Sequence, residues 1–257
     1  MIKVTETIYN YSPYYMKCIM ANIRGYNLIR WRYSHKTDNL VNEAEEREYW
    51  SEEQWNEYHH NRVQTIIEAS KKTHFYPNNN YNYKNDKGNQ FPILYKEKVR
   101  ESNSDFIAEP KNKNNLFHDH TSGSSGTPLS IWLDKESVQL WYALSERRWR
   151  NWYGITRRDK WAIFGGQLVI RQNVTEPPFW IENLSMKQLY FSIYHLSSQT
   201  VKHYVKKMVT FKPKYIYGYA SSLYTLAYEV RKQGLCLPSV SVVLSNAEPL
   251  YQHQKKL

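Results

Sequence analysis

Thr121-Ser122-Gly123-Ser124-Ser125-Gly126-Thr127-Pro128 is the stretch from which the fold of the chain is best interpreted. Five of its eight residues carry hydroxyl groups, and Gly123 and Gly126 can adopt positive φ without a steric cost. Such a run can fold so that successive N–H groups and hydroxyls point into one concavity, which forms a nest for an anion such as a polyphosphate. The sequence therefore predicts a phosphate loop made of Thr121, Ser122, Gly123, Ser124, Ser125, Gly126 and Thr127.

Two other interpretations of this stretch must be weighed. A run of Ser and Gly is also typical of a flexible linker. A Walker-type loop is excluded, because Gly126 is followed by Thr127 and Pro128 and not by lysine. Pro128 disfavours a helical conformation at Thr127, and the alternation in residues 129–133 then predicts a strand. The loop is therefore expected beside a strand.

The chain after this strand alternates between helical and extended patterns. Asp134 is expected to cap a helix over residues 135–153 that ends at Gly154. A further helix is expected from Ser221 or Ser222 to Gly234. The other elements expected here are a strand at 161–164, a helix at 197–210, a strand at 215–219, a buried strand at 240–244 and a helix beginning at Pro249. This alternation predicts a layered α/β domain over residues 111–257.

Residues 1–110 have mainly helical patterns. A short helix is expected from Pro13 to Ile23 with Ser12 as its cap, and a longer one from a cap at Ser51 to Lys72. The Asn-rich segment 77–90 predicts a loop, and residues 96–102 a short helix. The predicted fold is thus a helical N-terminal region followed by an incomplete α/β sheet domain.

Two clusters outside the loop have open interpretations. His118 and His120 would face the same side of an extended segment, but no third ligand is evident, so no metal site is predicted. Arg147, Arg148 and Arg150 fall near the end of the expected 135–153 helix. They would either bind an anionic substrate or offset the negative end of the helix dipole.

Composition limits the functional classes. The 257 residues carry a formal charge of +11, which raises the possibility of a nucleic-acid partner. The basic residues are scattered and no nucleic-acid-binding module is recognisable, so that partner is not favoured. The abundance of Lys, Asn and Tyr equally fits the coding bias of an AT-rich genome. No apolar run is long enough to span a membrane, no signal peptide is recognised, and Cys18 and Cys236 give no disulfide framework, so a cytoplasmic protein is expected.

Four stretches, in order along the chain, carry a resemblance to a known family. Thr121 to Leu129 resembles the Ser/Thr/Gly-rich signature of the adenylate-forming superfamily, and more closely its phenylacetate–coenzyme A ligase branch and the CapK-type proteins linked to capsular polysaccharide biosynthesis. Trp50 to Tyr76 with Phe91 to Glu97 is similar to the entry helix and the "FPILTK"-like segment of that branch. Gly218 to Tyr224 looks like its GYxSSLY stretch, and Ser245 to Leu250 like the segment beside adenine.

The resemblance implies an ATP-dependent ligase that activates a carboxylate as an acyl-adenylate, with Mg²⁺ and, for some members, coenzyme A. It implies that Thr121 to Thr127 hold phosphates, that Ala247, Glu248 and Pro249 lie at the adenine, and that Gly218 and Tyr219 shape the acid pocket. Without the resemblance, the last two sites are better interpreted as ordinary strand-to-helix turns.

The chain also departs from the family pattern. The motifs that follow in relatives, including the small C-terminal domain with its lysine, are not in these 257 residues, so no catalytic residue is assigned and no turnover is expected from the chain alone. We therefore expect the N-terminal part of such a ligase, whose other half could be a separate chain. The alternatives are a non-catalytic nucleotide-binding or interaction module, a decayed fragment, or a basic nucleic-acid binder.

Overall fold

The computed structural model describes residues 2–78, 93–108, 115–121 and 128–257, with side chains from residue 7 onward. Its contacts divide the chain into two compact units, which are described separately below. The sheet unit comprises Met1–Trp31 and Leu144–Leu257, and the helical unit comprises Arg32–Ala143. The predicted boundary between residues 110 and 111 lies outside the described residues and stays a prediction.

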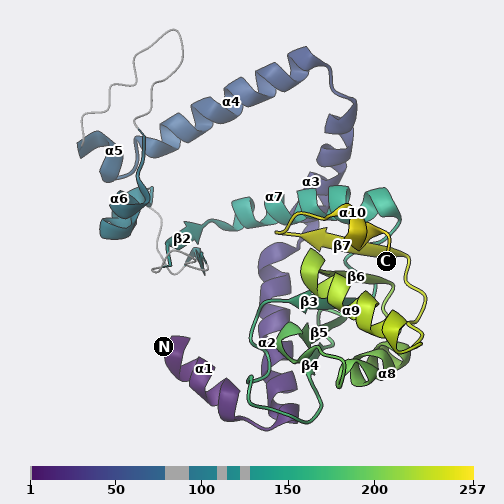
Figure 1. Cartoon of the computed structure of the whole chain (residues 1–257). Helices are drawn as coiled ribbons and strands as arrows, with labels where there is room; N and C mark the ends of the chain where they lie inside the picture. The colour runs from purple at the N-terminus through teal and green to yellow at the C-terminus, as the bar shows by residue number, and fades with distance from the viewer. Residues whose placement is uncertain (1, 79–92, 109–114, 122–127) are drawn as a thin grey trace. The chain divides into compact units, whose positions relative to one another are not determined.

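Helices and strands alternate through the second half of the chain, and helices dominate the first (Figure 1). The helices are α1 (Ile2–Tyr11), α2 (Tyr14–Arg32), α3 (His35–Glu46), α4 (Glu52–Ser70), α5 (Phe75–Asn78), α6 (Lys96–Glu101), α7 (Lys135–Ser145), α8 (Val201–Phe211), α9 (Ala220–Lys232) and α10 (Gln252–Lys255). The strands are β1 (Phe117–His120), β2 (Ser130–Leu133), β3 (Trp161–Gly165), β4 (Trp180–Asn183), β5 (Gln188–Ser192), β6 (Tyr215–Tyr219) and β7 (Val242–Asn246).

The sheet unit contains a five-stranded sheet with the order β4-β5-β3-β6-β7. Strands β5, β3, β6 and β7 run parallel, and β4 is antiparallel to β5. Parallel neighbours need a crossover connection, which α8 supplies between β5 and β6 and α9 between β6 and β7. The predicted fold class is confirmed: a helical N-terminal region is followed by a mixed α/β sheet.

The core of this unit lies between one sheet face and helices α8 and α9. Phe164 on β3 stacks on Phe191 of β5 with ring centroids 4.8 Å apart, and Tyr204 of α8 lies 5.0 Å from Phe191. All three side chains are buried. Removing each such aromatic side chain from water contributes about 1.5–3 kcal/mol, so this cluster is the main apolar source of stability for the sheet.

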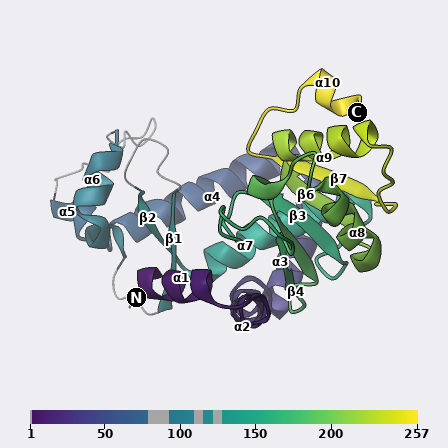
Figure 2. The same cartoon turned by 60° about the horizontal axis from the view of Figure 1, so that its bottom comes forward.

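The two edges of the sheet differ. At β4, the Asn22 side-chain amide on α2 donates to the Glu182 carbonyl oxygen at 3.1 Å, and Asn183 donates to Ala21 at 2.9 Å. Figure 2 shows α2 nearly end-on beside β4. A Cβ on Gly25 would lie 2.8 Å from Cγ of Asn183, so a glycine is required for this close approach. Helix α2 therefore covers the β4 edge.

At the opposite edge, β7 pairs with β6 alone among the described residues. Val243 is 56% exposed, and the strand alternates between half-buried and exposed positions. The prediction of a buried strand at 240–244 is therefore wrong in its burial, although the strand exists. Burial was predicted because a largely apolar run is typical of a parallel strand that is covered on both faces. The neighbouring elements cover β7 only in part.

The helical unit is built on local capping and aromatic contacts. Ser51 caps α4 as predicted, because its hydroxyl accepts the Gln54 N–H at 3.3 Å and the Gln54 side chain accepts the Ser51 N–H at 2.9 Å. Trp50, Trp55 and Tyr58 form edge-to-face ring contacts at the start of this helix. His59 and His60 on α4 are exposed.

Several element boundaries differ from the predictions. Helix α2 continues to Arg32, nine residues beyond the predicted end at Ile23, because its contacts with β4 and not its own sequence decide its length. Tyr219 and not Ser221 or Ser222 caps α9, and the last helix begins at Gln252 and not at Pro249. Strands β4 and β5 were not predicted.

Candidate functional site

The carboxyl ends of β3, β6 and β7 meet at one edge of the sheet. This edge brings together Gly165 at the end of β3, Gly218 and Tyr219 on β6, and Asn246 on β7, which is registered against Tyr219. Ligands of open α/β sheets commonly bind outside such carboxyl ends. The predicted adenine-side and acid-pocket residues therefore lie on adjacent strands at the same edge.

Glu248 ties the end of β7 to the beginning of α9. Its carboxylate accepts the Ser221 N–H at 2.8 Å and the Ser221 hydroxyl at 3.0 Å. A carboxylate at a helix N-terminus is stabilised by unpaired N–H groups and by the helix dipole. The protein's own carboxylate thus occupies the first turn of α9, so that turn is not left open for a phosphate.

The backbone between β7 and Glu248 has an unusual conformation. Ala247 has φ 62°, in the left-handed region that costs a residue with a Cβ about 1 kcal/mol or more. The residues on both sides of Ala247 are held by hydrogen bonds. After it, Glu248 accepts from Ser221, and before it, the Asn246 side-chain amide donates to the Tyr217 hydroxyl. Ala247, Glu248 and Pro249 are all exposed, so a ligand can reach them.

Gly218 and Tyr219 differ in what they contribute to the edge. A Cβ on Gly218 would lie 2.8 Å from the Phe164 carbonyl oxygen and 3.0 Å from the Phe164 Cβ, so Gly218 is required for packing β6 against β3. Tyr219 is half-buried, and its hydroxyl oxygen lies 3.0 Å from where a Cβ on Gly166 would be. Of the two predicted pocket residues, only Tyr219 presents a side chain at this edge.

Two further tyrosines at the end of β3 were missed in the sequence. The Tyr190 hydroxyl accepts the Gln167 N–H at 3.0 Å, and the Tyr194 hydroxyl donates to the Gly166 carbonyl at 2.9 Å. Burial raises the pKa of Tyr190 to about 12, so its hydroxyl stays protonated at neutral pH. Tyr190 lies on β5 and Tyr194 lies two residues after it. Because the sequence did not predict β5, it gave no signal that these two tyrosines would lie near the end of β3.

Thr121 joins the two strands of the β1–β2 hairpin in the helical unit. Its N–H donates to the Leu129 carbonyl at 3.0 Å, and its hydroxyl accepts the Leu129 N–H at 3.0 Å. The predicted strand beside the loop is present as β2. Ser122, Gly123, Ser124, Ser125, Gly126 and Thr127 lie outside the described residues, so the phosphate loop stays a prediction. Its described anchor and the sheet edge belong to different units.

The histidines before this loop have an aromatic partner. His118 stacks on Trp132 with ring centroids 4.4 Å apart, while His118 and His120 are 6.5 Å apart on the same face of β1. In the described parts of the chain, no group of three or more His, Cys, Asp or Glu side chains is placed to hold a metal ion.

Arg150 has an internal role. Its Nη1 lies 3.2 Å from Oε2 of Glu146, and its Nε donates to the Tyr215 hydroxyl at 3.1 Å. The same Glu146 carboxylate accepts the Arg157 N–H at 2.8 Å, and its side chain is only 4% exposed. Of the two interpretations of the arginine cluster, a structural one therefore holds for Arg150.

A Ser–His pair at the carboxyl end of β5 resembles part of a catalytic arrangement. His195 Nε2 lies 3.1 Å from the Arg171 carbonyl oxygen, which can only accept, so Nδ1 accepts from the Ser192 hydroxyl at 2.7 Å. Ser192 is fully buried and His195 stacks on Phe179 with centroids 5.0 Å apart. A substrate cannot reach this serine, and the pair instead holds the segment after β3 against β5.

His195 also predicts a pH dependence of stability. Burial lowers its pKa, so the folded protein keeps the ring neutral while the unfolded chain takes up a proton below about pH 6.5. The contribution of His195 to the free energy of unfolding is complete above that pH. It is lost as the pH falls toward the pKa of His195 in the folded protein, by at most about 1.4 kcal/mol per pH unit. Urea denaturation at pH 8 and pH 5.5 should show a larger drop for the parent than for His195→Gln; equal drops would contradict the prediction.

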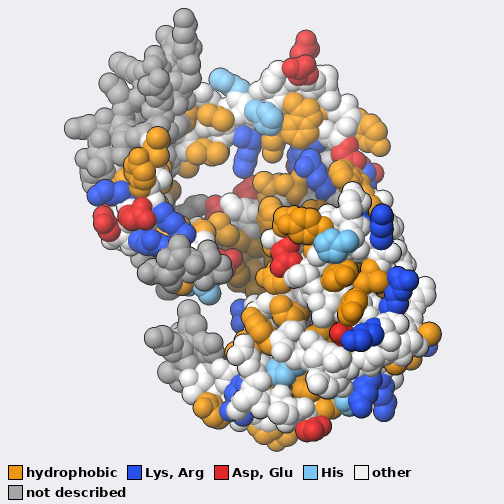
Figure 3. Space-filling view, viewed as in Figure 1, with side chains coloured by type: hydrophobic (Ala, Val, Ile, Leu, Met, Phe, Trp, Pro, Cys, Tyr) orange, Lys and Arg blue, Asp and Glu red, His pale blue; other side chains and the backbone are white. Residues whose placement is uncertain are grey.

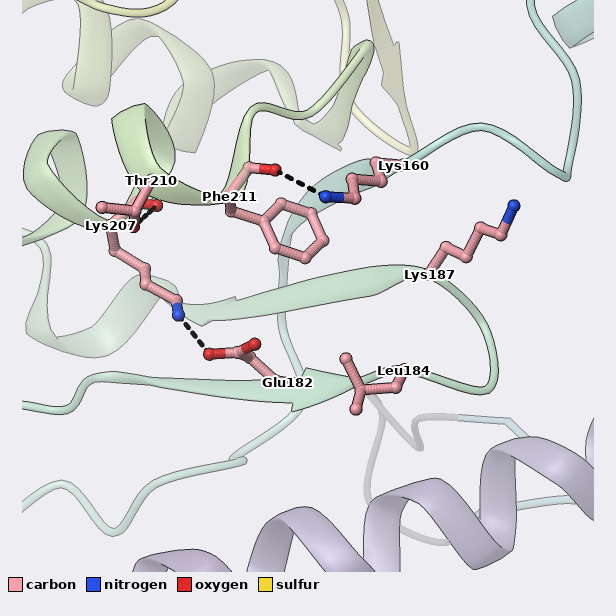
Figure 4. A pocket seen from close by; sticks show the side chains of 7 residues that line it. All are labelled: Lys160, Glu182, Leu184, Lys187, Lys207, Thr210 and Phe211. Atoms are coloured by element: carbon pink, nitrogen blue, oxygen red, sulfur yellow. Dashed lines mark hydrogen bonds and ion pairs between the residues drawn. The ribbon is translucent and has the colours of Figure 1, made fainter.

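A hollow of about 260 Å³ lies near the beginnings of β3 and β5 and the end of β4 (Figure 4). It is lined by Lys160, Glu182, Leu184, Lys187, Lys207, Thr210 and Phe211. Lys207 pairs with Glu182, and Lys160 donates to the Phe211 carbonyl at the end of α8, where a cation offsets the helix dipole. Lys187 points away from the hollow and donates to the Arg158 carbonyl at 2.7 Å. These charges have internal partners, and none of the predicted site residues lines the hollow.

Comparison with known proteins supports one relationship. The chain is 24% identical to "Protein CapK" of Staphylococcus aureus over an alignment of 253 residues, which covers 95% of this chain and 54% of that protein. The two proteins are related. No family model matches the chain.

The CapK relationship covers the helical unit and the sheet unit together, because the matched residues make up nearly the whole chain. The chain nevertheless spans only about half the length of the curated relative that it matches. None of the described helices is both long and apolar enough to cross a membrane. On the face in view, Lys and Arg side chains lie at separate places and not in one band (Figure 3).

Proposed function

We propose that this chain forms part of an ATP-dependent, CapK-type protein that activates a small carboxylate as an acyl-adenylate in capsular or surface polysaccharide biosynthesis. The observation that carries the proposal is the convergence of the predicted adenine-side residues and Tyr219 at the carboxyl edge of β6 and β7. The relationship to Protein CapK along 95% of the chain supports it.

Glu248 already occupies the first turn of α9, so that turn is not open to the phosphates of ATP. The family resemblance assigns phosphate binding to Thr121 to Thr127, and we retain that assignment in the proposal. The exposed Ala247 to Pro249 turn would then contact the adenine, and Tyr219 would border the acid. A loop of N–H and hydroxyl donors lowers the barrier by stabilising the charge that develops on the departing pyrophosphate.

Mg²⁺ would enter with ATP, since it is bound mainly by phosphate oxygens and water with one or two carboxylates. The described residues offer no carboxylate cluster for it, so no step is assigned to the metal. Coenzyme A as acceptor belongs to the same proposal.

A non-catalytic nucleotide-binding or interaction module is the second candidate. The two candidates differ in whether ATP is consumed. Release of pyrophosphate in the presence of carboxylates would favour the ligase, whereas binding without release would favour the module. A nucleic-acid binder predicts instead a steep salt dependence of DNA or RNA binding.

The test is titration calorimetry of ATP with Mg²⁺ on the parent chain and on Gly123→Val with Gly126→Val. Folding of both would be checked by circular dichroism. We expect the variant to bind at least about tenfold more weakly, or about 1.4 kcal/mol. A second variant, Ser124→Ala with Ser125→Ala, removes hydroxyls and keeps the glycines. Its matched control is Ser239→Ala with Ser241→Ala, which removes two exposed hydroxyls before β7. Absence of ATP binding by the folded parent would contradict the proposal for this chain.

A further inference from the structure

Two cations lie over tyrosine rings of α1, Lys17 at the start of α2 and Arg171 in the segment that follows β3. Lys17, in the first turn of α2, is only 6% exposed. Burial, and to a lesser extent the positive charge of Arg171, lowers the pKa of Lys17. The Nε of Arg171 is buried and has no hydrogen-bond partner. Burying a charge is costly unless it is paired, so these two cations need an explanation.

Tyrosine rings of α1 face both cations. Lys17 Nζ lies 5.6 Å from the centre of the Tyr9 ring, and the Arg171 guanidinium lies 4.9 Å from that of Tyr11. The Tyr9 hydroxyl donates to the Val169 carbonyl at 3.1 Å, which fixes α1 against the same segment. Cation–π contacts offset part of the desolvation cost, but they supply no negative charge.

The beginning of α2 adds further positive potential. Its first intrahelical bond is from the Lys17 N–H to the Pro13 carbonyl at 3.1 Å, so the N–H groups of Tyr14, Tyr15 and Met16 have no acceptor within the helix. The first turn carries no acidic residue, and α2 as a whole contains none. The positive end of a 19-residue helix dipole is therefore added to the two cations.

Two other buried charged groups among the described residues are paired with groups of opposite charge, although one nitrogen of Arg47 also has no hydrogen-bond partner. Glu146 lies between Arg150 and Arg157, and Arg47 is bound to Glu43. Lys17 and Arg171, in contrast, have no ion pair in the described structure. A lysine used only to pack its methylene groups would be better replaced by an apolar residue, so a bound anion is the simplest reason for two cations here.

We propose that Lys17, Arg171 and the first turn of α2 bind a phosphate group. A phosphate offers several oxygens, which suits an ammonium group, a guanidinium group and helix N–H donors together. It would reduce the repulsion between the two cations and satisfy the orphaned Nε of Arg171. This inference does not depend on the proposed nucleotide site, which uses other residues.

The phosphate group could come from a free small molecule or from a phospholipid head group. Tyr11, Tyr15, Met16 and Ile19 are exposed beside the site. Tyrosine and aliphatic side chains next to cations are typical of helices that lie at a lipid surface. The chemistry recognised at the site is the same in both cases, and the experiment separates the two sources.

The experiment compares the parent chain with Lys17→Met and Arg171→Gln, with Lys202→Met on the exposed side of α8 as the matched control. Inorganic phosphate is titrated by calorimetry, and thermal unfolding is followed with and without it. We expect phosphate to raise the unfolding temperature of the parent and of the control by about 5 °C at 100 times Kd. Each site variant should lose at least about tenfold in phosphate affinity.

A second readout separates a binding role from a packing role. Without phosphate, Lys17→Met should unfold at the same temperature as the parent or higher, because one of two like charges is removed. Sedimentation with phosphatidylglycerol and phosphatidylcholine vesicles tests the lipid source. Vesicle binding that needs phosphatidylglycerol and is lost in both site variants would assign the site to a head group, and phosphate binding alone to a free ligand. Equal binding by parent and variants, or no binding of either probe by the parent, would overturn the proposal.

Discussion

Replacing Glu146 with glutamine is expected to lower the free energy of unfolding by about 3 kcal/mol. The carboxylate accepts from Arg150 Nη1 at 3.2 Å and from the Arg157 N–H at 2.8 Å, and its side chain is 4% exposed. The substitution removes the negative charge that lies 3.2 Å from the Arg150 guanidinium and 4.0 Å from that of Arg157. Neutralising one partner of a buried ion pair costs more than the pair itself contributes to stability.

Urea denaturation of parent and variant measures this loss. Glu68→Gln is the control, because Glu68 pairs with Lys71 on the surface of α4 and exposed pairs of this kind are worth about 0.5 kcal/mol or less. A loss below about 1 kcal/mol for Glu146→Gln would mean that water or other groups compensate the arginines, and that the carboxylate is not central to the stability of the sheet unit.

The second large effect is expected for Gly218→Val, which should cost about 3 kcal/mol. Even a single Cβ at Gly218 would lie 2.8 Å from the Phe164 carbonyl oxygen and 3.3 Å from Cδ2 of Leu223. These atoms belong to the central strand β3 and to α9, so they cannot move without disturbing the core. A branched side chain adds two more carbon atoms in the same space.

Ser245→Val on β7 is the matched control, since Ser245 is registered directly against Gly218 and is exposed. It should change the free energy of unfolding by no more than about 0.5 kcal/mol in denaturation monitored by circular dichroism. Gly218→Ala should fall between the two. If Gly218→Val were as stable as the control, Gly218 would be free for a role in a pocket, and the packing argument would be wrong.

The elements that sequence predicted best are those whose signals are local. Ser51 with Gln54, and Asp134 at the start of α7, are capping patterns that act within one helical turn, and both occur. Strands β4 and β5 were missed because they are short and follow Pro177 and Pro178 with little alternation. Their positions are set by pairing with β3 and by α2, which are contacts between distant parts of the chain.

For the candidate site, the sequence located turns but not the contacts between them. The stretch around Gly218 and the stretch around Glu248 were both assigned to strand ends, and the parallel register of β6 and β7 brings them together. The hydrogen bonds from Ser221 to Glu248 join residues 27 positions apart, so no local pattern indicates them. The same limit explains why Ser221 was mistaken for a helix cap.

The strand order also determines how the sheet can assemble during synthesis. Strand β3 leaves the ribosome first and lies in the centre, with β5 on one side and β6 and then β7 on the other. Three adjacent parallel strands and the crossover helix α8 are therefore available before β7 has been made, and folding can proceed outward from the centre. Helix α2 is made long before the strand that it contacts. The hydrogen bond from Asn183 to Ala21 joins residues 162 positions apart, so α2 can contact β4 only after the whole intervening chain has been synthesised.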